Sequence, residues 1–244
     1  MTKEEQYLIS HAHDKYNECI NKNMITATGF LDMHEQTVLA NERFSGRFMF
    51  FGGYEDAERK ILCFLPDYLE EPEGLSVLKA VYRGHKKLTH RDFLGSLMSL
   101  GIKRENIGDI IVSDNGAQII IKDEIGEFLL TNLASAGRAT LALELLPVSE
   151  LVLSKAEVKE VLKTVASLRL DSVVAAIFNI SRTQSCGFIA AGKVFLNSQE
   201  VLKPDKPICE GDKLTLRSKG KAVITSASGT SKKGRVILKA NLYI

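Results

Sequence analysis

The chain has 244 residues, of which 45% are hydrophobic and 25% charged, and its formal net charge is +2. No apolar run approaches the roughly 20 residues that span a bilayer, and the first residues, MTKEEQYLIS, lack a signal-peptide core, so we expect a cytoplasmic protein without a membrane span. The cysteines at 19, 63, 186 and 209 form no C-x-x-C pair, which argues against a metal site or disulfide framework, and no cofactor is expected.

The first 75 residues predict a small α+β domain. Apolar positions at helical spacing indicate an amphipathic helix over 3–22, and a turn and a short helix follow it. Two apolar strands, 47–51 and 60–65, are joined by the loop GGYEDAER, which places glycines and charges between buried strands. Such a loop is either a tight structural turn or a functional surface.

The segment 76–150 shows the order strand, helix, strand, strand, helix, strand, which is that of the split βαβ, or RRM-like, fold. The elements are predicted at 75–84, 90–101, 108–123 (two strands about a D-N-G turn), 124–137 and 139–147. An RNA-reading RRM presents aromatic side chains on a central strand, where this chain has Ile119, Ile120 and Ile121. We therefore expect this domain to be a scaffold or a protein-binding unit.

Residues 151–168 are predicted to be a connector that is partly helical at SKAEVKEVLKTV, and a C-terminal domain follows over 169–244. In that domain a short helix over 170–180 precedes a second one that begins at Ser181. Ser181 and Gln184 form the S-x-x-Q pattern of a capping box, and strands joined by tight turns and a basic loop complete the domain. The fold class is therefore α+β, with three domains.

Charge is divided unevenly along the chain. Residues 165–244 contain 13 lysines and arginines against 5 acidic residues, or +8, whereas residues 1–164 contain 19 against 25, or −6. A basic end on an acidic body is typical of proteins whose basic end meets a polyanion. A solvated basic surface without a ligand is the alternative.

The start of the second helix is suited to an anionic ligand. A helix start offers unpaired N–H groups and a partial positive charge to a phosphate, and Arg182 there adds a bidentate fork. Arg169, just before the first helix, can reach the same face, and further basic residues would extend it. The candidate RNA-binding residues are Arg169, Arg182, Thr183, Gln184, Lys193, Arg217, Lys219 and Lys221.

Four blocks in this region carry a resemblance to a known domain. RLDSVV, SRTQS, AGKVFLN and EGDKLTLR, in that order over about 169–225, resemble the alpha-L RNA-binding motif named after ribosomal protein S-four. The resemblance implies that Arg169 and Arg182 are the RNA-facing arginines and that Lys219, Gly220 and Lys221 form the basic loop. The chain departs from the motif at Gln184, where a lysine or arginine is usual, at Ser185, which replaces an alanine, and at Cys186-Gly187.

Other stretches extend the likeness over nearly the whole chain. FFGGYEDAERKILCFLP, LTHRDFLGSLMSLGIKRENIGDIIV and TVASLRLDSVVAAIFNISR resemble the YlmH family of bacterial proteins. The resemblance implies a non-enzymatic factor that binds rRNA and tRNA on the large ribosomal subunit, in ribosome-associated quality control of stalled peptidyl-tRNA. A protein partner of the acidic N-terminal domains is also expected. An older interpretation of the family links it to cell division.

Two other classes of function stay open. An RNA-modifying enzyme would need a concave pocket near Gly52–Arg59 with converging carboxylates. A cell-division interaction protein would need a partner surface on the middle domain. Arg169-Leu170-Asp171 also matches the RLD of pseudouridine synthases, but a helical sequence follows here, so Asp171 is interpreted as a helix cap.

Overall fold

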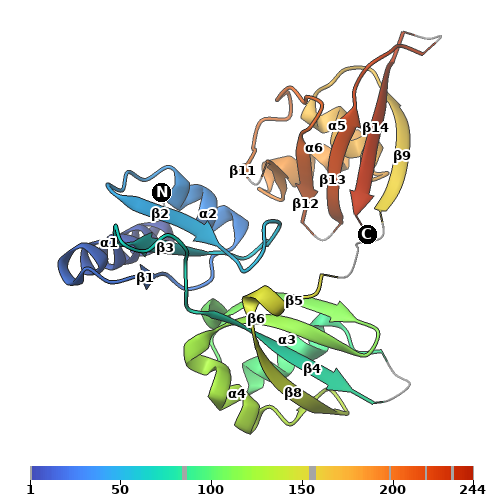
Figure 1. The fold of residues 1–244 in the computed structure, drawn as a ribbon. Helices are drawn as coiled ribbons and strands as arrows, with labels where there is room; N and C mark the ends of the chain where they lie inside the picture. The colour runs from blue at the N-terminus through green and yellow to red at the C-terminus, as the bar shows by residue number, and fades with distance from the viewer. Residues whose placement is uncertain are drawn as a thin grey trace. The chain divides into compact units, whose positions relative to one another are not determined.

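The computed structural model describes residues 2–83, 87–153, 158–197, 199–217, 219–231 and 234–243. Its helices and strands gather into two compact units, residues 1–154 and 155–244 (Figure 1). The segments 1–75 and 76–150 thus share one unit, and the second unit begins before residue 169. Among the described residues no helix is long and apolar enough to cross a membrane.

The first unit opens with two helices beside a small antiparallel sheet. Its elements are α1 (Lys3–Lys22), β1 (Thr26–Ala27), α2 (Met33–Ala40), β2 (Arg47–Phe51) and β3 (Ile61–Leu65). The strand order β1-β3-β2 makes β3 central, and all five of its residues are buried. Both helices begin with a capping box, Thr2 with Glu5 and Asp32 with Glu35. The expected helix over 3–22 and both expected strands are confirmed.

The rest of the first unit follows the expected order of strands and helices. Its elements are β4 (Leu75–Tyr82), α3 (His90–Ser99), η1 (Arg104–Asn106), β5 (Ile107–Ser113), β6 (Gly116–Lys122), η2 (Asp123–Ile125), α4 (Gly126–Asn132), β7 (Ser135–Ala136), β8 (Ala139–Pro147) and η3 (Val148–Glu150). The strands form one antiparallel sheet in the order β5-β6-β4-β8-β7. Side chains of α3 and α4 share a buried core with one face of this sheet, where Ile119 and Ile121 lie.

The helix expected over 124–137 is wrong in its second half. The helix α4 ends at Asn132, and Ser135–Ala136 pair with β8 instead. Gly137 has a positive φ of 58° and forms the two-residue turn between these strands. A glycine at such a turn resembles a helix C-terminal glycine in sequence, because both positions need the left-handed conformation.

The helix-free face of the sheet is partly covered within its own unit. Ile120 is fully buried there against Phe30, Val148 and Leu151. Gln118 both donates to and accepts from the main chain of Val152, at 2.5 and 2.9 Å. The described strand residues on this face therefore offer no aromatic platform of the kind on which an RRM stacks bases.

The loop GGYEDAER is fixed to β5 by one carboxylate. Asp109 accepts hydrogen bonds from the Tyr54 hydroxyl at 2.8 Å and from the N–H groups of Glu58 and Arg59 at 2.7 and 3.1 Å. Burial, followed by the charge of Asp109, raises the pKa of Tyr54. A Cβ at Gly52 would lie only 2.6 Å from the Arg59 carbonyl oxygen, so the turn needs glycine. These contacts identify the loop as a structural turn that joins the segments 1–75 and 76–150.

The guanidinium of Arg59 serves the same junction. It donates to the carbonyl oxygens of Phe30 and Ile107, at 2.7 and 3.2 Å. Arg104 also donates to the Ile107 carbonyl and to that of Gly108. Burial and the neighbouring charge of Arg59 lower the pKa of Arg104 to about 10. Both arginines are thus used to satisfy main-chain carbonyls in the first unit.

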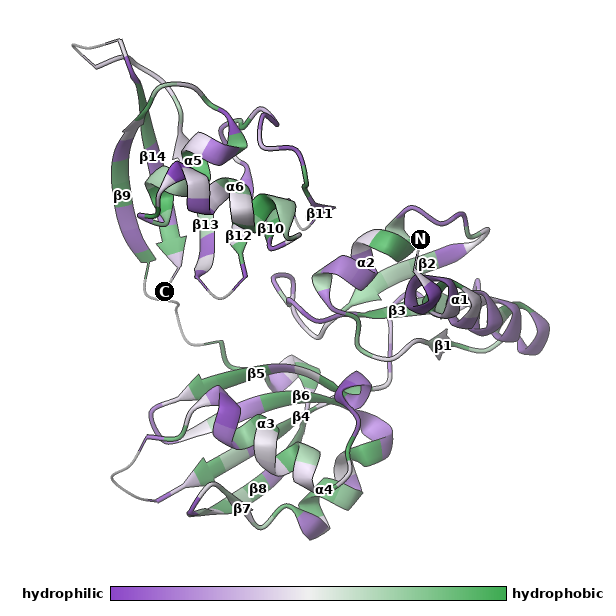
Figure 2. Ribbon diagram, turned by 180° about the vertical axis from the view of Figure 1, so that it is seen from behind, coloured by the Kyte–Doolittle hydropathy of each residue, from purple (hydrophilic) through white to green (hydrophobic). Residues whose placement is uncertain are grey.

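The second unit is a six-stranded antiparallel sheet covered on one face by two helices. Its elements are β9 (Val158–Val165), α5 (Leu170–Ile177), α6 (Arg182–Ala190), β10 (Val194–Leu196), β11 (Gln199–Glu200), β12 (Lys213–Leu216), β13 (Gly220–Ser226) and β14 (Val236–Tyr243). The strand order is β11-β10-β12-β13-β14-β9. Figure 2 shows α5 and α6 lying over the strands, and their apolar residues share one core with them.

The partly helical connector expected over 154–165 is wrong for its described part. Residues 158–165 form β9, which pairs with β14 over eight residue pairs from Val158↔Tyr243 to Val165↔Val236. Residues 154–157 lie outside the described part. Apolar residues at 158, 161, 162 and 165 have the spacing of a helix face, but β-branched residues favour a strand when a partner is present.

Candidate nucleic-acid interface

Asp171 holds the two arginines that the sequence singles out. Its Oδ2 accepts two hydrogen bonds from Arg182, from Nε at 2.9 Å and from a terminal nitrogen at 2.7 Å. Its Oδ1 accepts from Arg169 Nε at 3.3 Å and from the N–H of Ser172 at 2.8 Å. Asp171 is the second residue of α5, and the N-cap is Arg169. The expected role of Asp171 as a helix cap is therefore corrected: it is an anchor for two arginines.

Burial differs sharply between the carboxylate and its partners. The side chain of Asp171 is 3% exposed, whereas those of Arg169 and Arg182 are 43% and 61% exposed. Burial alone would raise the pKa of the Asp171 carboxyl, but hydrogen bonds from Arg182 and Arg169 outweigh it, and the pKa lies below its ordinary value. The carboxylate therefore stays ionised and holds two cations at the surface.

The start of α6 has the predicted local geometry. Ser181 Oγ accepts from the N–H of Gln184 at 3.1 Å, and Gln184 Oε1 accepts from the N–H of Ser181 at 3.0 Å, so the capping box is confirmed. Arg182 is the first residue of the helix, and both Thr183 and Gln184 are exposed. Because Gln184 forms the capping box, it serves the helix start where the resemblance would place a cation.

Two lysines that no sequence pattern indicates, Lys203 and Lys206, lie beside Arg169. The N–H groups of Leu170 and Asp171 donate to the carbonyl oxygens of Lys206 and Pro204, at 2.9 and 3.0 Å. The segment KPDKP, 203–207, is thereby fixed next to the arginines, and both of its lysines are exposed. Two lysines flanked by prolines were the only local signal, and nothing in the sequence places them near residue 169.

Three further predicted residues lie where β10, β12 and β13 are connected. The N–H of Arg217 donates to the carbonyl oxygen of Lys193 at 2.9 Å, so these two residues are neighbours. Lys193 lies over the ring of Phe188, and Arg217 over that of Phe195, 5.9 and 6.0 Å from the centroids. Lys219 is exposed in the turn between β12 and β13.

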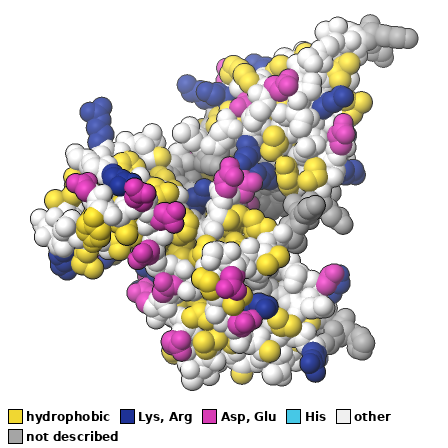
Figure 3. Space-filling model, in the orientation of Figure 1, with side chains coloured by type: hydrophobic (Ala, Val, Ile, Leu, Met, Phe, Trp, Pro, Cys, Tyr) yellow, Lys and Arg dark blue, Asp and Glu magenta, His cyan; other side chains and the backbone are white. Residues whose placement is uncertain are grey.

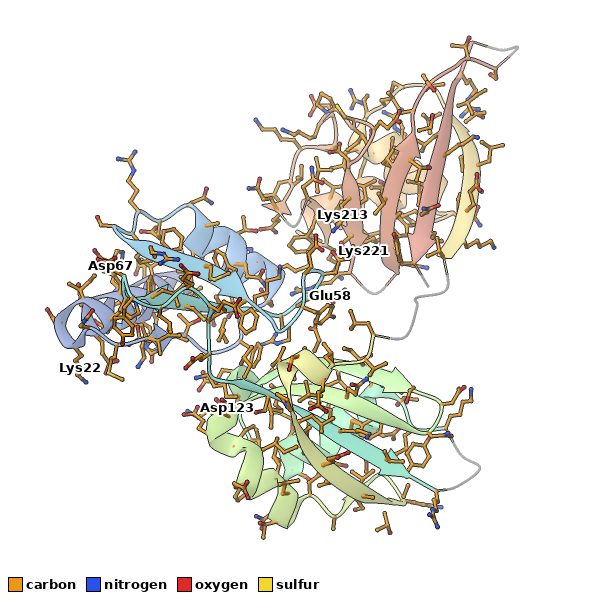
Figure 4. All side chains as sticks on the ribbon, in the orientation of Figure 1. Lys22, Glu58, Asp67, Asp123, Lys213 and Lys221 are labelled. Carbon is orange, nitrogen blue, oxygen red and sulfur yellow. The ribbon has the colours of Figure 1, made fainter. Side chains whose placement is uncertain are left out.

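Lys221 lies on the other face of the sheet. It is paired with Thr215, while the adjacent Ala222 and Leu216 belong to the core under α5 and α6. Since successive residues of a strand point to opposite faces, Lys221 points away from the helices. Figure 4 labels it together with Lys213 on the neighbouring strand. The expectation that Lys221 extends the Arg182 face is therefore not met by the geometry.

A metal site, or an enzyme site at the loop 52–59, has less support in the geometry of the chain. Among the described residues, no group of three His, Cys, Asp or Glu side chains could hold a metal ion. A groove of about 970 Å³ in the first unit is lined by α1, residues 27–31 and residues 101–106, not by the loop at 52–59.

On the face shown in Figure 3, lysine and arginine side chains are visible on both units, without one continuous patch.

Comparison with known proteins identifies one relative over almost the whole chain. It is the Bacillus subtilis (strain 168) protein named "Ribosome-associated protein quality control protein P2". The two sequences are 33% identical over 239 residues, which cover 96% of this chain and 93% of the relative.

Two other comparisons concern the first unit and the fold. A family model described as "Putative RNA-binding domain in YlmH" matches residues 76–150. That description departs from the scaffold or protein-binding role that the isoleucines at 119–121 favour. The solved structure "Cell division protein ylmH from Streptococcus pneumoniae" matches with a TM-score of 0.52 and 21% identity, over 62% of this chain and 95% of that one. At that identity the likeness concerns the fold alone.

Proposed function

The chain belongs to the YlmH family, and on that premise we propose that it is a non-enzymatic RNA-binding factor of ribosome-associated quality control. It binds rRNA and tRNA on the large ribosomal subunit and stabilises stalled peptidyl-tRNA complexes. The name of the Bacillus relative and the description of the family model support the ribosomal and the RNA-binding parts of this proposal. A protein partner of the acidic first unit, and a cytoplasmic location, belong to the same proposal.

The observation that carries the proposal is the pair of exposed arginines held by one buried carboxylate. Arg169 and Arg182 are fixed by Asp171, so little side-chain entropy remains to be lost when a phosphate binds. The Asp171 bonds use Nε and one terminal nitrogen of Arg182. Among the described residues no partner takes the other terminal nitrogen, so it can bond a ligand. This second unit, which we interpret as an alpha-L domain, would grip structured RNA by its backbone.

The first unit has a different part in the proposal. We interpret its segment 76–150 as RRM-like, in agreement with its strand order β5-β6-β4-β8. Because the described helix-free face lacks stacking aromatics, RNA contacts of this segment would be made through its loops and main chain. The second unit would then supply most of the phosphate affinity, and the first unit would orient the complex.

The test is co-sedimentation with large ribosomal subunits, with and without tRNA, at several salt concentrations. The double variant Arg169→Ala/Arg182→Ala should bind at least about tenfold more weakly, with a salt slope lower by about 2, because two phosphate contacts are lost. The matched control is Arg43→Ala/Arg47→Ala, which removes two exposed arginines from the first unit. Near-normal binding by a folded Arg169/Arg182 variant would contradict the site, and failure of the wild type to bind would contradict the function.

A further inference from the structure

A surface groove of about 480 Å³ lies between the edge strand β9 and the helices of the second unit. Its lining comes from the end of β9, from α5, from the link between α5 and α6, and from Arg182 and Arg235. The groove thus includes one of the two arginines on which the proposed function rests. It also reaches two segments outside 169–225, the stretch that resembles the alpha-L motif.

The lining of this groove is cationic. Lys163, Arg182 and Arg235 all contribute to it, and among the described lining residues there is no aspartate or glutamate. Ser172 and Asn179 add neutral polar side chains. Three cations together with neutral hydrogen-bonding groups suit a ligand that carries several negative charges and hydroxyl groups.

The fold holds the two additional cations in place. Lys163 is paired with Leu238, which lies in the core under α5 and α6, so Lys163 is on the helix side of the sheet. A terminal nitrogen of Arg235 donates to the Thr164 carbonyl oxygen at 3.0 Å, and its N–H donates to Ser231 Oγ at 3.1 Å. Arg235 is therefore bonded to β9, which is the strand that carries Lys163.

We propose that this groove binds the sugar–phosphate backbone of the RNA, with Lys163 and Arg235 as phosphate contacts that continue from Arg182. The proposal rests on the proposed function and adds a second set of contacts to it. A run of phosphates can engage cations that come from three separate segments, whereas a single phosphate ion engages a smaller number. The side chains of Ser172 and Asn179 can bond ribose hydroxyl groups, including the 2′-hydroxyl that distinguishes RNA.

The test compares two double variants in titrations of a labelled RNA hairpin at several salt concentrations. Lys163→Ala/Arg235→Ala removes the two groove cations, and Lys159→Ala/Lys239→Ala removes two lysines of the same pair of strands outside the groove. The groove variant should bind about tenfold more weakly, with a salt slope lower by about 2. The control should keep the salt slope of the wild type.

Folding of each variant is checked by circular dichroism, because Arg235 also supports β9. If the double alanine variant does not fold, Lys163→Gln and Arg235→Lys replace it; the first removes a charge and the second retains one. Weaker RNA binding by Lys163→Gln, with Arg235→Lys closer to wild type, supports the proposal. Equal binding by both variants and the wild type overturns it.

The outcomes separate the groove from the function. If Arg169→Ala/Arg182→Ala loses RNA and the groove variant behaves like its control, the groove proposal falls and the proposed function stands. If the wild type itself does not bind RNA, both fall. Inorganic phosphate and poly-glutamate are tested as competitors of the labelled hairpin. If either displaces it as effectively as unlabelled RNA does, the groove binds small anions or acidic proteins, and the RNA backbone is overturned as its ligand.

Discussion

Each unit contains an aspartate that accepts several hydrogen bonds close to arginines, but the two arrangements expose their arginines differently. In the first unit Asp109 accepts from a tyrosine hydroxyl and two main-chain N–H groups, and the nearby Arg59 donates to main-chain carbonyls. In the second unit Asp171 is buried, and its arginine partners are largely exposed. The first arrangement uses its arginine inside the protein, and the second presents two arginines at the surface.

The comparison gives a criterion for functional arginines. An arginine whose donors are directed at carbonyls between two packed segments stabilises the fold, because those carbonyls would otherwise be buried without partners. An arginine held on one side by a carboxylate and exposed on the other is positioned for an anionic ligand. By this criterion Arg59 and Arg104 are structural, whereas Arg169 and Arg182 are candidates for binding.

The largest expected effect comes from removing the acceptor of the first unit. Asp109→Ala should lower the free energy of unfolding of that unit by about 3 kcal/mol, since three hydrogen bonds to a carboxylate are lost. RNA affinity should change little at temperatures where the unit stays folded. Urea unfolding followed by circular dichroism measures the loss. Asp114→Ala, which removes an exposed carboxylate paired with Lys87, is the control and should be nearly neutral.

Removing the corresponding charge in the second unit should affect stability and binding together. Asp171→Asn keeps the shape but weakens the bonds to both arginines, and should cost about 2 kcal/mol of unfolding free energy. The loss of a negative charge would by itself strengthen RNA binding, whereas the loss of arginine positioning would weaken it. We expect weaker binding in RNA titrations of the folded variant. Stronger binding would show that net charge, not positioning, decides affinity.

A smaller change tests how closely RNA approaches α6. An added Cβ at Gly187 would meet nothing within 4 Å, so Gly187→Ala should stabilise the second unit by about 1 kcal/mol through helix propensity alone. If RNA lies against this side of α6, the same variant should bind more weakly despite its greater stability. Thermal unfolding and RNA titration of one preparation measure both quantities. A less stable variant would contradict the structure of the helix at this point.

The smallest expected effect is on the stability of the second unit at acid pH. Since the pKa of Asp171 is lowered in the folded state, its contribution to stability is present above the unfolded value of about 4 and is lost as pH falls through the folded value. The unfolding temperature of the second unit should therefore be level from neutral pH down to about pH 5 and fall below about pH 4. The Asp171→Asn variant should show a shallower fall. Identical acid profiles would assign the effect to other carboxylates.

The local signals of the sequence were sufficient for most elements. Capping pairs such as Ser181 with Gln184, apolar periodicity and turn glycines predicted both α5 and α6 and the strands beside the loop at 52–59. The strand β9 was missed because its partner, β14, is far away in sequence, and only that pairing favours a strand over a helix. Gly137 was misread because a hairpin turn and a helix end require the same conformation.

The candidate site was predictable only where its residues carry a local sequence signal. Arg169 and Arg182 stand at helix starts, which the sequence can show. The role of Asp171 depends on a partner eleven residues away across the α5–α6 junction, and it was mistaken for a cap. Lys206, Lys163 and Arg235 reach the arginines only through strand and loop pairing, so no local pattern indicates them.

The position of β14 has a consequence for the timing of synthesis. This strand, Val236–Tyr243, lies between β13 and β9, so the sheet is incomplete until these residues are present. The helices with Arg169 and Arg182 leave the ribosome earlier, but β9 has no partner until β14 emerges. A nascent chain would thus hold the β9 side of the groove unassembled until residues 236–243 have emerged. The proposed RNA surface would become complete only once residues 236–243 have emerged, later than the arginines at the starts of α5 and α6.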